Sequence, residues 1–482
     1  MTTKGYEVEY AAVAAGARLD APVSVPRWLE SAVFYQVFPE RFCNGDPSND
    51  PAYVEPWGGV PTRENFFGGD LQGITQHLDH IQSLGANALY LTPVFTAGTN
   101  HRYDGEDYFA IDPVLGGDTA FNELVDGAHG RGMRVVLDGV FNHCGWHHPY
   151  FEDVLDKGAR SRYVNWFLVE DFPVVSDPAP NYETCSGCAY LPKWNVYNPE
   201  VREHHFRVAV HWLERGIDGW RLDVPYFIND VFWKRFRSVV KDRFPDACLI
   251  GEEWQSPTRW LHGDTFDGTM NYGLRDLALD YAATRKADAS ATARAALALQ
   301  DAIPPHAAPA MMNLLGSHDT PRLFQECGDD VAAVCEALAL MFAFPGAPMI
   351  YYGDEVGMRG DNDPGCRGCM SWDRNDWNHE LLAVFKSFTG ARRDSMSLGR
   401  GRLEIPYAVG DVIALRNNTM NGTTTTLINR NSAATVVPGD LMPPHGRDLM
   451  TLVGGRFAKP PTAVGDWLVV PGRSVRLVEE VR

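Results

Sequence analysis

The stretch GIDGWRLDVPYF, residues 216–227, places an arginine and an aspartate two positions apart inside an apolar, strand-like run. Burying such a pair is costly unless the two charges serve each other or a reaction. A fixed cation lowers the pKa of a neighbouring carboxyl group, so we expect Arg221 to keep Asp223 ionised at neutral pH. Asp223 is therefore a candidate nucleophile.

Three other acids stand at the ends of strand-like runs: Asp138 in LDGVFNH, Glu252 in LIGEEW and Asp319 in GSHDTPR. His143 and His318 lie beside two of them. A single acid in such a place caps the next helix about as often as it reacts. In an eight-stranded α/β barrel, however, all strand ends meet at one mouth, which predicts that these side chains converge.

Carboxylates gathered around an arginine suit glycoside hydrolysis, which needs a nucleophile, a proton donor and a stabilising charge. We expect Glu252 to retain its proton, because it would lie near the Asp223 anion in a low-dielectric pocket. Glu253 is the competitor for the acid role, but strand alternation points it to the other side. Thirteen tryptophans supply flat apolar faces of the kind that sugar rings stack on.

Short β-branched or aromatic runs alternate with helical patterns from residue 32 onward, which predicts a parallel sheet with crossover helices. The segments 73–85 and 201–216 repeat apolar residues three and four apart and end in glycine, as helices do. Eight strands predict a (β/α)8 TIM barrel. The strand candidates are AVFYQVFP, ALYLTPVF, RVVLDGVFNH, GWRLDV, ACLIGEEW, GTMNY, MMNLLGSHD and PMIYYGDE.

The barrel rhythm is interrupted after the third strand and stops near residue 396, where alternating runs separated by Gly, Asn and Pro predict an antiparallel β-sandwich. The predicted organisation is an N-terminal extension (1–27), a barrel (28–143 and 198–395), an insertion (144–197) and a C-terminal β-sandwich (396–482).

The composition limits the partners. The formal charge of −19 opposes general attraction to nucleic acid or to an anionic membrane. The first twenty residues lack the basic segment and long apolar core of a signal peptide, and no apolar run reaches about 18 residues. Nine scattered cysteines favour reduced thiols. We therefore expect a cytoplasmic protein, whose oligomeric state the sequence leaves open.

The motifs DGVFNH, GWRLDV, GEEW and GSHDTPR, in this order on this barrel, resemble the conserved regions of the α-amylase family of glycoside hydrolases. ERFCNGDPSNDP, TRENFFGGDLQGI, HRYDGEDYFAIDP and NDPGCRGCMSWD are similar to its neopullulanase, cyclomaltodextrinase and maltogenic amylase branch. The resemblance implies cleavage of α-1,4 bonds in maltodextrins, cyclodextrins or pullulan, with transglycosylation in some members. It also implies that the insertion is the family's domain B and the terminal sheet its domain C.

The resemblance assigns roles position by position. It implies Asp223 as nucleophile, Glu252 as acid and base, and Asp319 as transition-state stabiliser, with retention through a covalent glucosyl-Asp intermediate. It further implies that the sugar at the cleavage subsite is bound by Asp138, His143, Arg221 and His318 and stacks on Tyr103. For each histidine the alternative is a buried, hydrogen-bonded residue without a ligand, and for Tyr103 a packed aromatic.

A cluster of oxygen-bearing residues in CNGDPSND, namely Asn44, Asp46, Asn49 and Asp50, has the composition of a Ca²⁺ site, although such clusters are usually turns. The resemblance implies calcium here, with further oxygens from Gly68 and Asp70. We expect a structural calcium ion with no part in the chemistry, and no organic cofactor.

Two Cys-x-x-Cys pairs, Cys185/Cys188 and Cys366/Cys369, fall on predicted loops above the same barrel face. They raise the alternative of a shared zinc ion or of disulfides, against free thiols.

The sequence departs from the branch in three places. LPKWN (191–195) stands where MPKLN is usual, VPYF (224–227) stands where VANE is usual, and about 27 residues precede the first strand where members carry an N-terminal β domain. Both replaced stretches should line acceptor subsites. An isomerase or glucosyltransferase on the same scaffold is therefore the nearest alternative, and a non-catalytic glucan-binding protein the more distant one.

Overall fold

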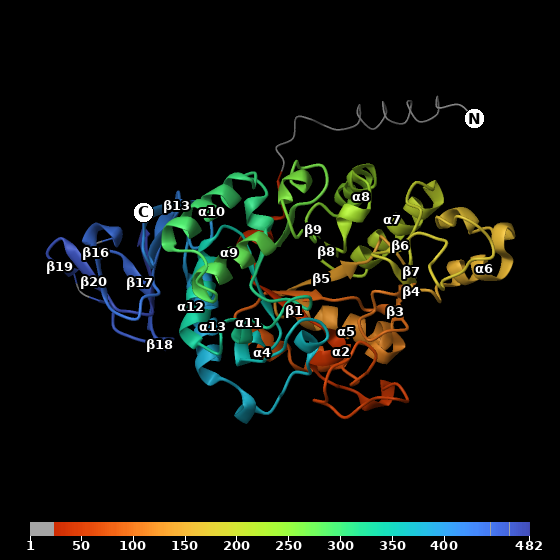
Figure 1. Ribbon diagram of the computed structural model, residues 1–482, viewed down its shortest axis with the longest axis horizontal. Helices are drawn as coiled ribbons and strands as arrows, with labels where there is room; N and C mark the ends of the chain where they lie inside the picture. The colour runs from red at the N-terminus through yellow and green to blue at the C-terminus, as the bar shows by residue number, and fades with distance from the viewer. Residues whose placement is uncertain (1–23, 444, 462) are drawn as a thin grey trace.

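Eight parallel strands close into a barrel at the centre of the molecule, as the computed structural model shows (Figure 1). The structure describes residues 24–482 except 444 and 462, so most of the predicted N-terminal extension lies outside the described residues. Each strand pairs with its neighbours in chain order, and the first pairs with the last. All eight predicted strands are confirmed: β1 (Phe34–Val37), β2 (Ala88–Leu91), β5 (Arg134–Gly139), β8 (Gly219–Leu222), β9 (Cys248–Gly251), β10 (Gly268–Asn271), β11 (Met312–Leu314) and β12 (Ala347–Tyr351).

Helices surround the barrel and pack apolar side chains against its outer face (Figure 1). They are α2 (Pro39–Phe42), α3 (Leu71–Gln76), α4 (Leu78–Ser83), α5 (Gly117–His129), α7 (Pro199–Glu214), α8 (Asp230–Arg243), α9 (Tyr272–Ala282), α10 (Ala289–Asp301), α11 (Leu323–Glu326), α12 (Val331–Ala343) and α13 (His379–Asp394). Among the described residues, none of the helices is long and apolar enough to cross a membrane.

Helix α7 shows how local chemistry sets these boundaries. The side chain of Asn198 accepts a hydrogen bond from the backbone N–H of Glu200, and Pro199 occupies the first turn, where its missing N–H is harmless. After the last turn, Gly216 adopts a left-handed φ of 101°, which side chains disfavour. The predicted helix at 201–216 is thus confirmed with its glycine stop.

The predicted helix at 73–85 is wrong in one respect, because the chain forms two short helices, α3 and α4, that meet at His77. His77 has φ −110° and ψ 12°, outside helical geometry. Its ring stacks flat on Trp372 with centroids 3.5 Å apart. Trp372 is almost 300 residues away, so the pattern of residues 73–85 carried no sign of this contact.

Two further units lie at opposite ends of the molecule (Figure 1). The segment between β5 and α7 holds α6 (Pro149–Lys157) and a hairpin of β6 (Thr184–Cys185) and β7 (Cys188–Pro192), and a separate two-stranded sheet joins β3 (Phe95–Ala97) to β4 (Gly105–Ile111). At the other end, two antiparallel sheets form the C-terminal unit. Their strands are β13 (Arg402–Val409), β14 (Val412–Thr419), β15 (Gly422–Asn429), β16 (Thr435–Pro438), β17 (Arg447–Val453), β18 (Arg456–Phe457), β19 (Ala463–Val464), β20 (Trp467–Val470) and β21 (Ser474–Val481).

Candidate active site

Arg221 forms the centre of a charged cluster at the C-terminal ends of three neighbouring strands. Its guanidinium is fully buried, and its Nη1 donates to Asp138 Oδ1 at 2.9 Å and to Asp223 Oδ1 at 2.8 Å. Its Nη2 lies 3.1 Å from Glu252 Oε1. We call these four residues the mouth cluster.

The sheet register explains why these residues meet. Strand β8 lies between β5 and β9, and Arg221 stands opposite Asp138 of β5. The ladder continues beyond the strands, since Asp223 N–H donates to Gly139 O and Glu252 N–H donates to Leu222 O. Parallel pairing therefore brings the side chains that end each strand to one level.

The mouth cluster corrects the expected balance of charge. Burial is the largest influence on the pKa of Asp223 and raises it well above its ordinary value, whereas the nearby Arg221 guanidinium lowers it. Arg221 thus opposes the protonation of Asp223 but does not dominate its surroundings. One guanidinium faces three carboxyl groups, so full ionisation would leave the cluster with a net negative charge in a low-dielectric site, which favours retention of a proton.

Glu252 is buried beside Asp223, and its carboxyl group has several hydrogen-bond donors around it. Its Oε2 accepts a hydrogen bond from the backbone N–H of Val224 at 2.9 Å, and its Oε1 accepts one from Trp254 Nε1 at 3.0 Å. Together with Arg221, these donors hold the carboxyl group in a fixed orientation beside Asp223. Glu253 is held elsewhere, because its Oε2 accepts a hydrogen bond from Trp260 Nε1 at 2.7 Å.

Val224, directly after Asp223, has an unusual backbone. It adopts φ 35° and ψ 51°, in the left-handed region that a β-branched residue rarely enters. Such a conformation stores about 1–3 kcal/mol and persists only where the surroundings enforce it. Here it directs the Val224 N–H at Glu252, so the strain is located between the two candidate reacting groups.

On the other side of the mouth, Asp319 lies between His318 and Arg367. Its Oδ2 lies 2.9 Å from His318 Nε2, and its Oδ1 accepts a hydrogen bond from Arg367 Nη2 at 3.0 Å. Burial acts to raise the pKa of Asp319, but its neighbours His318 and Arg367 outweigh this effect and hold the pKa well below its usual range. Asp319 therefore carries a stable negative charge and remains about a quarter exposed, at 27%.

Tyr103 links the two sides. Its hydroxyl group donates to Asp138 Oδ2 at 3.0 Å and lies 2.6 Å from His318 Nε2, while its ring is nearly parallel to that of His318. Tyr90, buried in β2, donates to the same Asp138 oxygen at 2.7 Å. Asp138 thus accepts hydrogen bonds from two tyrosines and Arg221, which fixes it as a support of the site.

His143 is buried, and its Nε2 has no hydrogen-bond partner among the described residues. Burial lowers the pKa of His143 to about 4, so the ring is neutral at pH 7. Its backbone forms a bridge with Lys193 of the inserted segment. A neutral ring nitrogen left free at this position is available to a ligand.

Partly exposed aromatic side chains lie close to the mouth cluster. Trp254, 40% exposed, stacks on Tyr272 with ring centroids 3.7 Å apart. Tyr226 and Phe227, which replace part of the branch's usual VANE, are also exposed and contact each other edge to face. Such surfaces suit the apolar faces of sugar rings.

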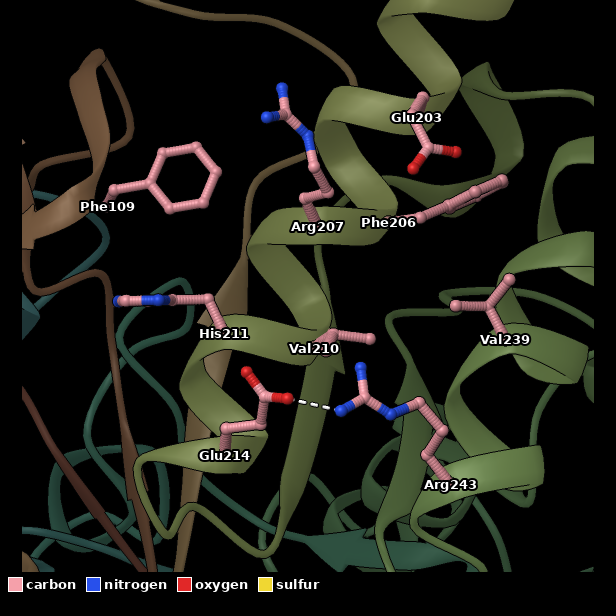
Figure 2. A pocket seen from close by; sticks show the side chains of 9 residues that line it. All are labelled: Phe109, Glu203, Phe206, Arg207, Val210, His211, Glu214, Val239 and Arg243. Carbon is pink, nitrogen blue, oxygen red and sulfur yellow. Dashed lines mark hydrogen bonds and ion pairs between the residues drawn. The ribbon is translucent and has the colours of Figure 1, made fainter.

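The structure also has a surface hollow of about 380 Å³ on the outer side of α7 and α8, well apart from the strand ends (Figure 2). An ion pair between Glu214 and Arg243 spans it. Its walls carry no residue of the mouth cluster, so it is not the candidate active site.

The predicted calcium residues gather in the connection between β1 and α3. The amide oxygens of Asn44 and Asn49 are buried and have no partner among the described residues. Gly68 packs so tightly that a Cβ there would lie 2.2 Å from Asp50 Oδ1. These free oxygens fit a hard cation.

All three carboxylates of that set have protein partners, and Asp50 Oδ1 accepts a hydrogen bond from Asn44 Nδ2 at 2.8 Å. Asp70 accepts hydrogen bonds from the backbone N–H groups of Gly45, Asp46 and Gly73, and Asp46 caps the following turn through Ser48. Within the described residues, no group of three or more His, Cys, Asp or Glu side chains is placed to hold a metal ion. The donor set that fits therefore consists mainly of amide and backbone oxygens.

The cysteine pairs do not form the shared site considered above. All nine cysteines are free thiols. Cys185 and Cys188 face each other across the β6–β7 hairpin, whereas Cys366 donates to the carbonyl oxygen of His318 at 3.1 Å. Burial raises the pKa of Cys185 to about 12 and that of Cys366 to about 11, which keeps both thiols protonated.

Comparison with known proteins decides the family. The sequence pattern of the α-amylase catalytic domain matches residues 36–397. The chain therefore belongs to the α-amylase family. It is an α-amylase family hydrolase, and its relatives confirm the predicted branch. It is 44% identical over 440 residues to a cyclomaltodextrinase of Geobacillus thermopakistaniensis, covering 90% of this chain and 74% of that protein. It is also 44% identical over 388 residues to neopullulanase 2 of Thermoactinomyces vulgaris, covering 80% and 66%.

One solved structure matches this chain over nearly the whole length of both proteins. The cyclic α-maltosyl-(1→6)-maltose hydrolase of Arthrobacter globiformis, in complex with its cyclic substrate, superposes with a TM-score of 0.89 at 50% identity. The alignment covers 95% of this chain and 100% of that one.

The sequence analysis missed four residues that the structure places in the site: Gln36, Tyr90, Trp254 and Arg367. Gln36 was visible as the one polar residue inside an apolar strand. Tyr90 was visible as an inward position of β2, and Trp254 and Arg367 lay in motifs already noted for their resemblance. Only the fold shows that they contact the predicted residues.

Proposed function

We propose that this enzyme hydrolyses α-glucosidic bonds in small α-glucans with retention, through a covalent glucosyl-Asp223 intermediate. The observation that supports it best is the mouth cluster, in which one buried guanidinium holds two differently bonded carboxyl groups, Asp223 and Glu252, side by side. The family resemblance adds the role of each group.

In the first step, Asp223 Oδ2 attacks the anomeric carbon, because Oδ1 is engaged by Arg221. The bond from this carbon to the leaving oxygen breaks, and Glu252 gives its proton to that oxygen. Glu252 can donate to the leaving oxygen only after it loses one of its present hydrogen bonds. The bond from Trp254 Nε1 is the one to break, because Trp254 is exposed whereas the other donors are backbone or fully buried. Asp319 stabilises the positive charge that develops on the sugar.

In the second step, Glu252 takes a proton from water, the water oxygen bonds to the anomeric carbon, and the bond to Asp223 breaks. A sugar hydroxyl in place of water would give transfer instead. His143 and His318 would bind hydroxyl groups of the sugar, as the resemblance implies, and Tyr103 would provide the stacking face.

We infer that the preferred substrate is a small cyclic α-glucan, with cyclic α-maltosyl-(1→6)-maltose as the first candidate. This is supported by 50% identity to the Arthrobacter enzyme over nearly the whole of both chains. Cyclodextrin is the second candidate, supported by the identity to cyclomaltodextrinases, but those relatives are longer than this chain. The exposed Tyr226 and Phe227 beside the cluster provide apolar contacts for either ring.

The test is a chromatographic product time course on cyclic α-maltosyl-(1→6)-maltose, β-cyclodextrin, pullulan and maltotriose in parallel, for the wild type and Asp223→Ala. We expect the first substrate to be cleaved fastest and every cleavage to depend on Asp223. Faster cleavage of β-cyclodextrin would contradict the substrate proposal while leaving the mechanism intact. Products longer than the substrate would indicate transfer, and absence of any turnover by folded protein would contradict hydrolysis altogether.

We further propose that a Ca²⁺ ion binds in the β1–α3 connection through Asn44, Asn49, Asp50 and the carbonyl oxygen of Gly68, with Asp46 and Asp70 shaping the loop around it. Bound there, calcium would supply stability rather than chemistry. An ion at 100 to 1,000 times its Kd contributes about 3–4 kcal/mol. We therefore expect chelator to lower the Tm, and added calcium to restore it.

Asn49→Ala should abolish this calcium-dependent shift, whereas Asn421→Ala, at an exposed turn, should preserve it. A Tm that is the same in chelator and in calcium would contradict the site.

A further inference from the structure

Gln36 is a fully buried amide inside β1, and only β2 lies between this strand and β5 of the mouth cluster. Its Nε2 lies 2.7 Å from His318 Nδ1. The Gln36 Oε1 has no hydrogen-bond partner among the described residues, and an unpaired buried polar atom costs about 1–3 kcal/mol. An amide kept in a barrel core at that cost needs a reason. The contact with His318 is the one that connects Gln36 to the active site.

The hydrogen atoms around His318 can be counted. An amide nitrogen only donates, so the Gln36 contact requires a lone pair on Nδ1. The proton of a neutral ring is then on Nε2, which faces Asp319 Oδ2 at 2.9 Å and Tyr103 Oη at 2.6 Å. Both of these oxygens can accept. The Tyr103 proton remains free to be donated to Asp138.

The other neutral form of His318 does not fit its neighbours. With the proton on Nδ1, the Nε2 lone pair would face the lone pairs of the Asp319 carboxylate, which Arg367 Nη2 pairs at 3.0 Å. A rotated Gln36 amide, offering its oxygen to Nδ1, fits only a doubly protonated ring. The orientation of one amide therefore sets the state of the histidine.

We propose that Gln36 is a positioning residue of the reaction, which holds His318 in the neutral form protonated at Nε2 so that this N–H is presented to Asp319 and to a substrate hydroxyl. The part concerning the substrate rests on the proposed function. The part concerning the ring does not, since it follows from contacts within the protein.

The groups that face His318 come from several elements. Gln36 contacts Nδ1 from β1, Tyr103 contacts Nε2 from the β3–β4 connection, and Asp319 follows on its own loop. Its carbonyl oxygen accepts hydrogen bonds from Cys366 Sγ and Arg367 Nε. Among these groups, Gln36 is the one that contacts Nδ1. A substitution of Gln36 therefore changes directly which ring nitrogen of His318 carries the proton.

The test uses ¹⁵N-histidine NMR of the ligand-free protein, with His318→Asn to assign the His318 signals by difference. We expect an unprotonated Nδ1 and a protonated Nε2 at pH 7. In Gln36→Glu, the carboxylate accepts from Nδ1, so we expect that nitrogen to become protonated. In Gln36→Met, which fills similar space without a donor, we expect a mixture of tautomers.

Kinetics provide the second readout. We expect kcat to fall roughly 10- to 100-fold in Gln36→Met, as for other residues that orient a functional histidine. The fall in Gln36→Glu should be larger, up to roughly 10⁴-fold, as for an incorrect tautomer in a catalytic histidine. The pH profile of kcat/KM should change shape in Gln36→Glu only.

Asn313→Leu is the matched control, because Asn313 is another buried barrel amide but donates to Phe344 O. It should lower the Tm without changing the His318 signals or the pH profile. Protonation of Nδ1 in the wild type, or unchanged His318 signals in Gln36→Glu, would overturn the proposal. A wild type that hydrolyses none of the glucans would contradict the proposed function alone, because the NMR readout needs no substrate.

Discussion

Two buried groups of titratable side chains respond to burial in opposite ways, one including Asp138 of β5 and the other His148 of the segment that follows this strand. The mouth cluster contains a permanent cation, and every carboxyl group in it is hydrogen-bonded. The second group, which we call the histidine cluster, consists of His148, His204 and His205 at the contact of α7 with the inserted segment, and it is at most 3% exposed.

The histidine cluster has no counter-charge. Both ring nitrogens of His204 and of His205 lack a hydrogen-bond partner among the described residues, and Trp194 packs against all three rings. Burial lowers the pKa of His148 to about 3 and that of His204 to about 4, and it lowers that of His205 well below its ordinary value. The rings therefore act as neutral packing groups. Charge survives burial where a guanidinium fixes it, and elsewhere burial removes it.

The largest expected effect is the loss of catalysis when the mouth cluster loses its nucleophile. Asp223→Ala should lower kcat by roughly 10⁴-fold or more, since no other group can form the intermediate. The Tm should stay near that of the wild type, because a repelling carboxylate is removed from a site with excess acid. Asp156→Ala, at an exposed helix position, is the control. Substantial hydrolysis by pure Asp223→Ala would refute the role.

Removing the cation should test whether it stabilises the fold as well as the reaction. Arg221→Met leaves Asp138, Asp223 and Glu252 buried without a counter-charge, which should reduce the free energy of unfolding by about 3–5 kcal/mol. The loss should be smaller at acid pH, where the carboxyl groups are protonated. Urea unfolding at two pH values measures this loss of unfolding free energy. The double variant Arg221→Met, Asp138→Asn should recover part of the lost stability. An equal loss at both pH values would show that packing, not charge, is responsible.

The histidine cluster should make the protein sensitive to acid. Above about pH 6.5 neither the folded nor the unfolded state protonates these rings, so they add no slope to stability. Between about pH 6.5 and pH 4 the unfolded chain binds protons that the folded chain does not. Stability therefore falls as pH falls, by up to about 1.4 kcal/mol per pH unit for each ring.

His205→Phe should remove one proton from this dependence and raise the Tm at pH 5 relative to the wild type. His147→Phe, at a 67% exposed position in the loop that carries His148, should not. Equal pH dependence of unfolding in His205→Phe and the wild type would contradict neutral burial of this ring.

The smallest expected effect concerns the strain beside the mouth cluster. Val224→Gly adopts the left-handed backbone without penalty, so we expect stability to rise by about 1 kcal/mol. We expect kcat to fall, because a freer peptide holds Glu252 less firmly. Thermal unfolding and kinetics on one preparation check both. A gain in stability with unchanged kcat would separate the strain from the reaction.

The sequence was informative where function depends on strand order and residue type. The eight strands and the acids at their ends could be predicted because the spacing of apolar residues and the position of a polar residue are local properties of the sequence. Parallel pairing of the strands then places Asp138 beside Arg221. The break at His77 depends on Trp372, and the donors to Glu252 depend on the backbone of Val224, so neither has a local signature. The raised pKa of Asp223 has a similar origin, since the burial that causes it is a sum over several elements.

The pairing of β1 with β12 has a consequence for the order in which the protein can be completed. The barrel cannot close until residues 347–351 have left the ribosome, although Gln36 and Tyr90 are made more than 250 residues earlier. The buried charges of the mouth cluster must therefore remain hydrated during most of translation. A chain released before residue 347 would keep an open sheet edge at β1, and we expect such truncated chains to aggregate rather than to form a smaller enzyme.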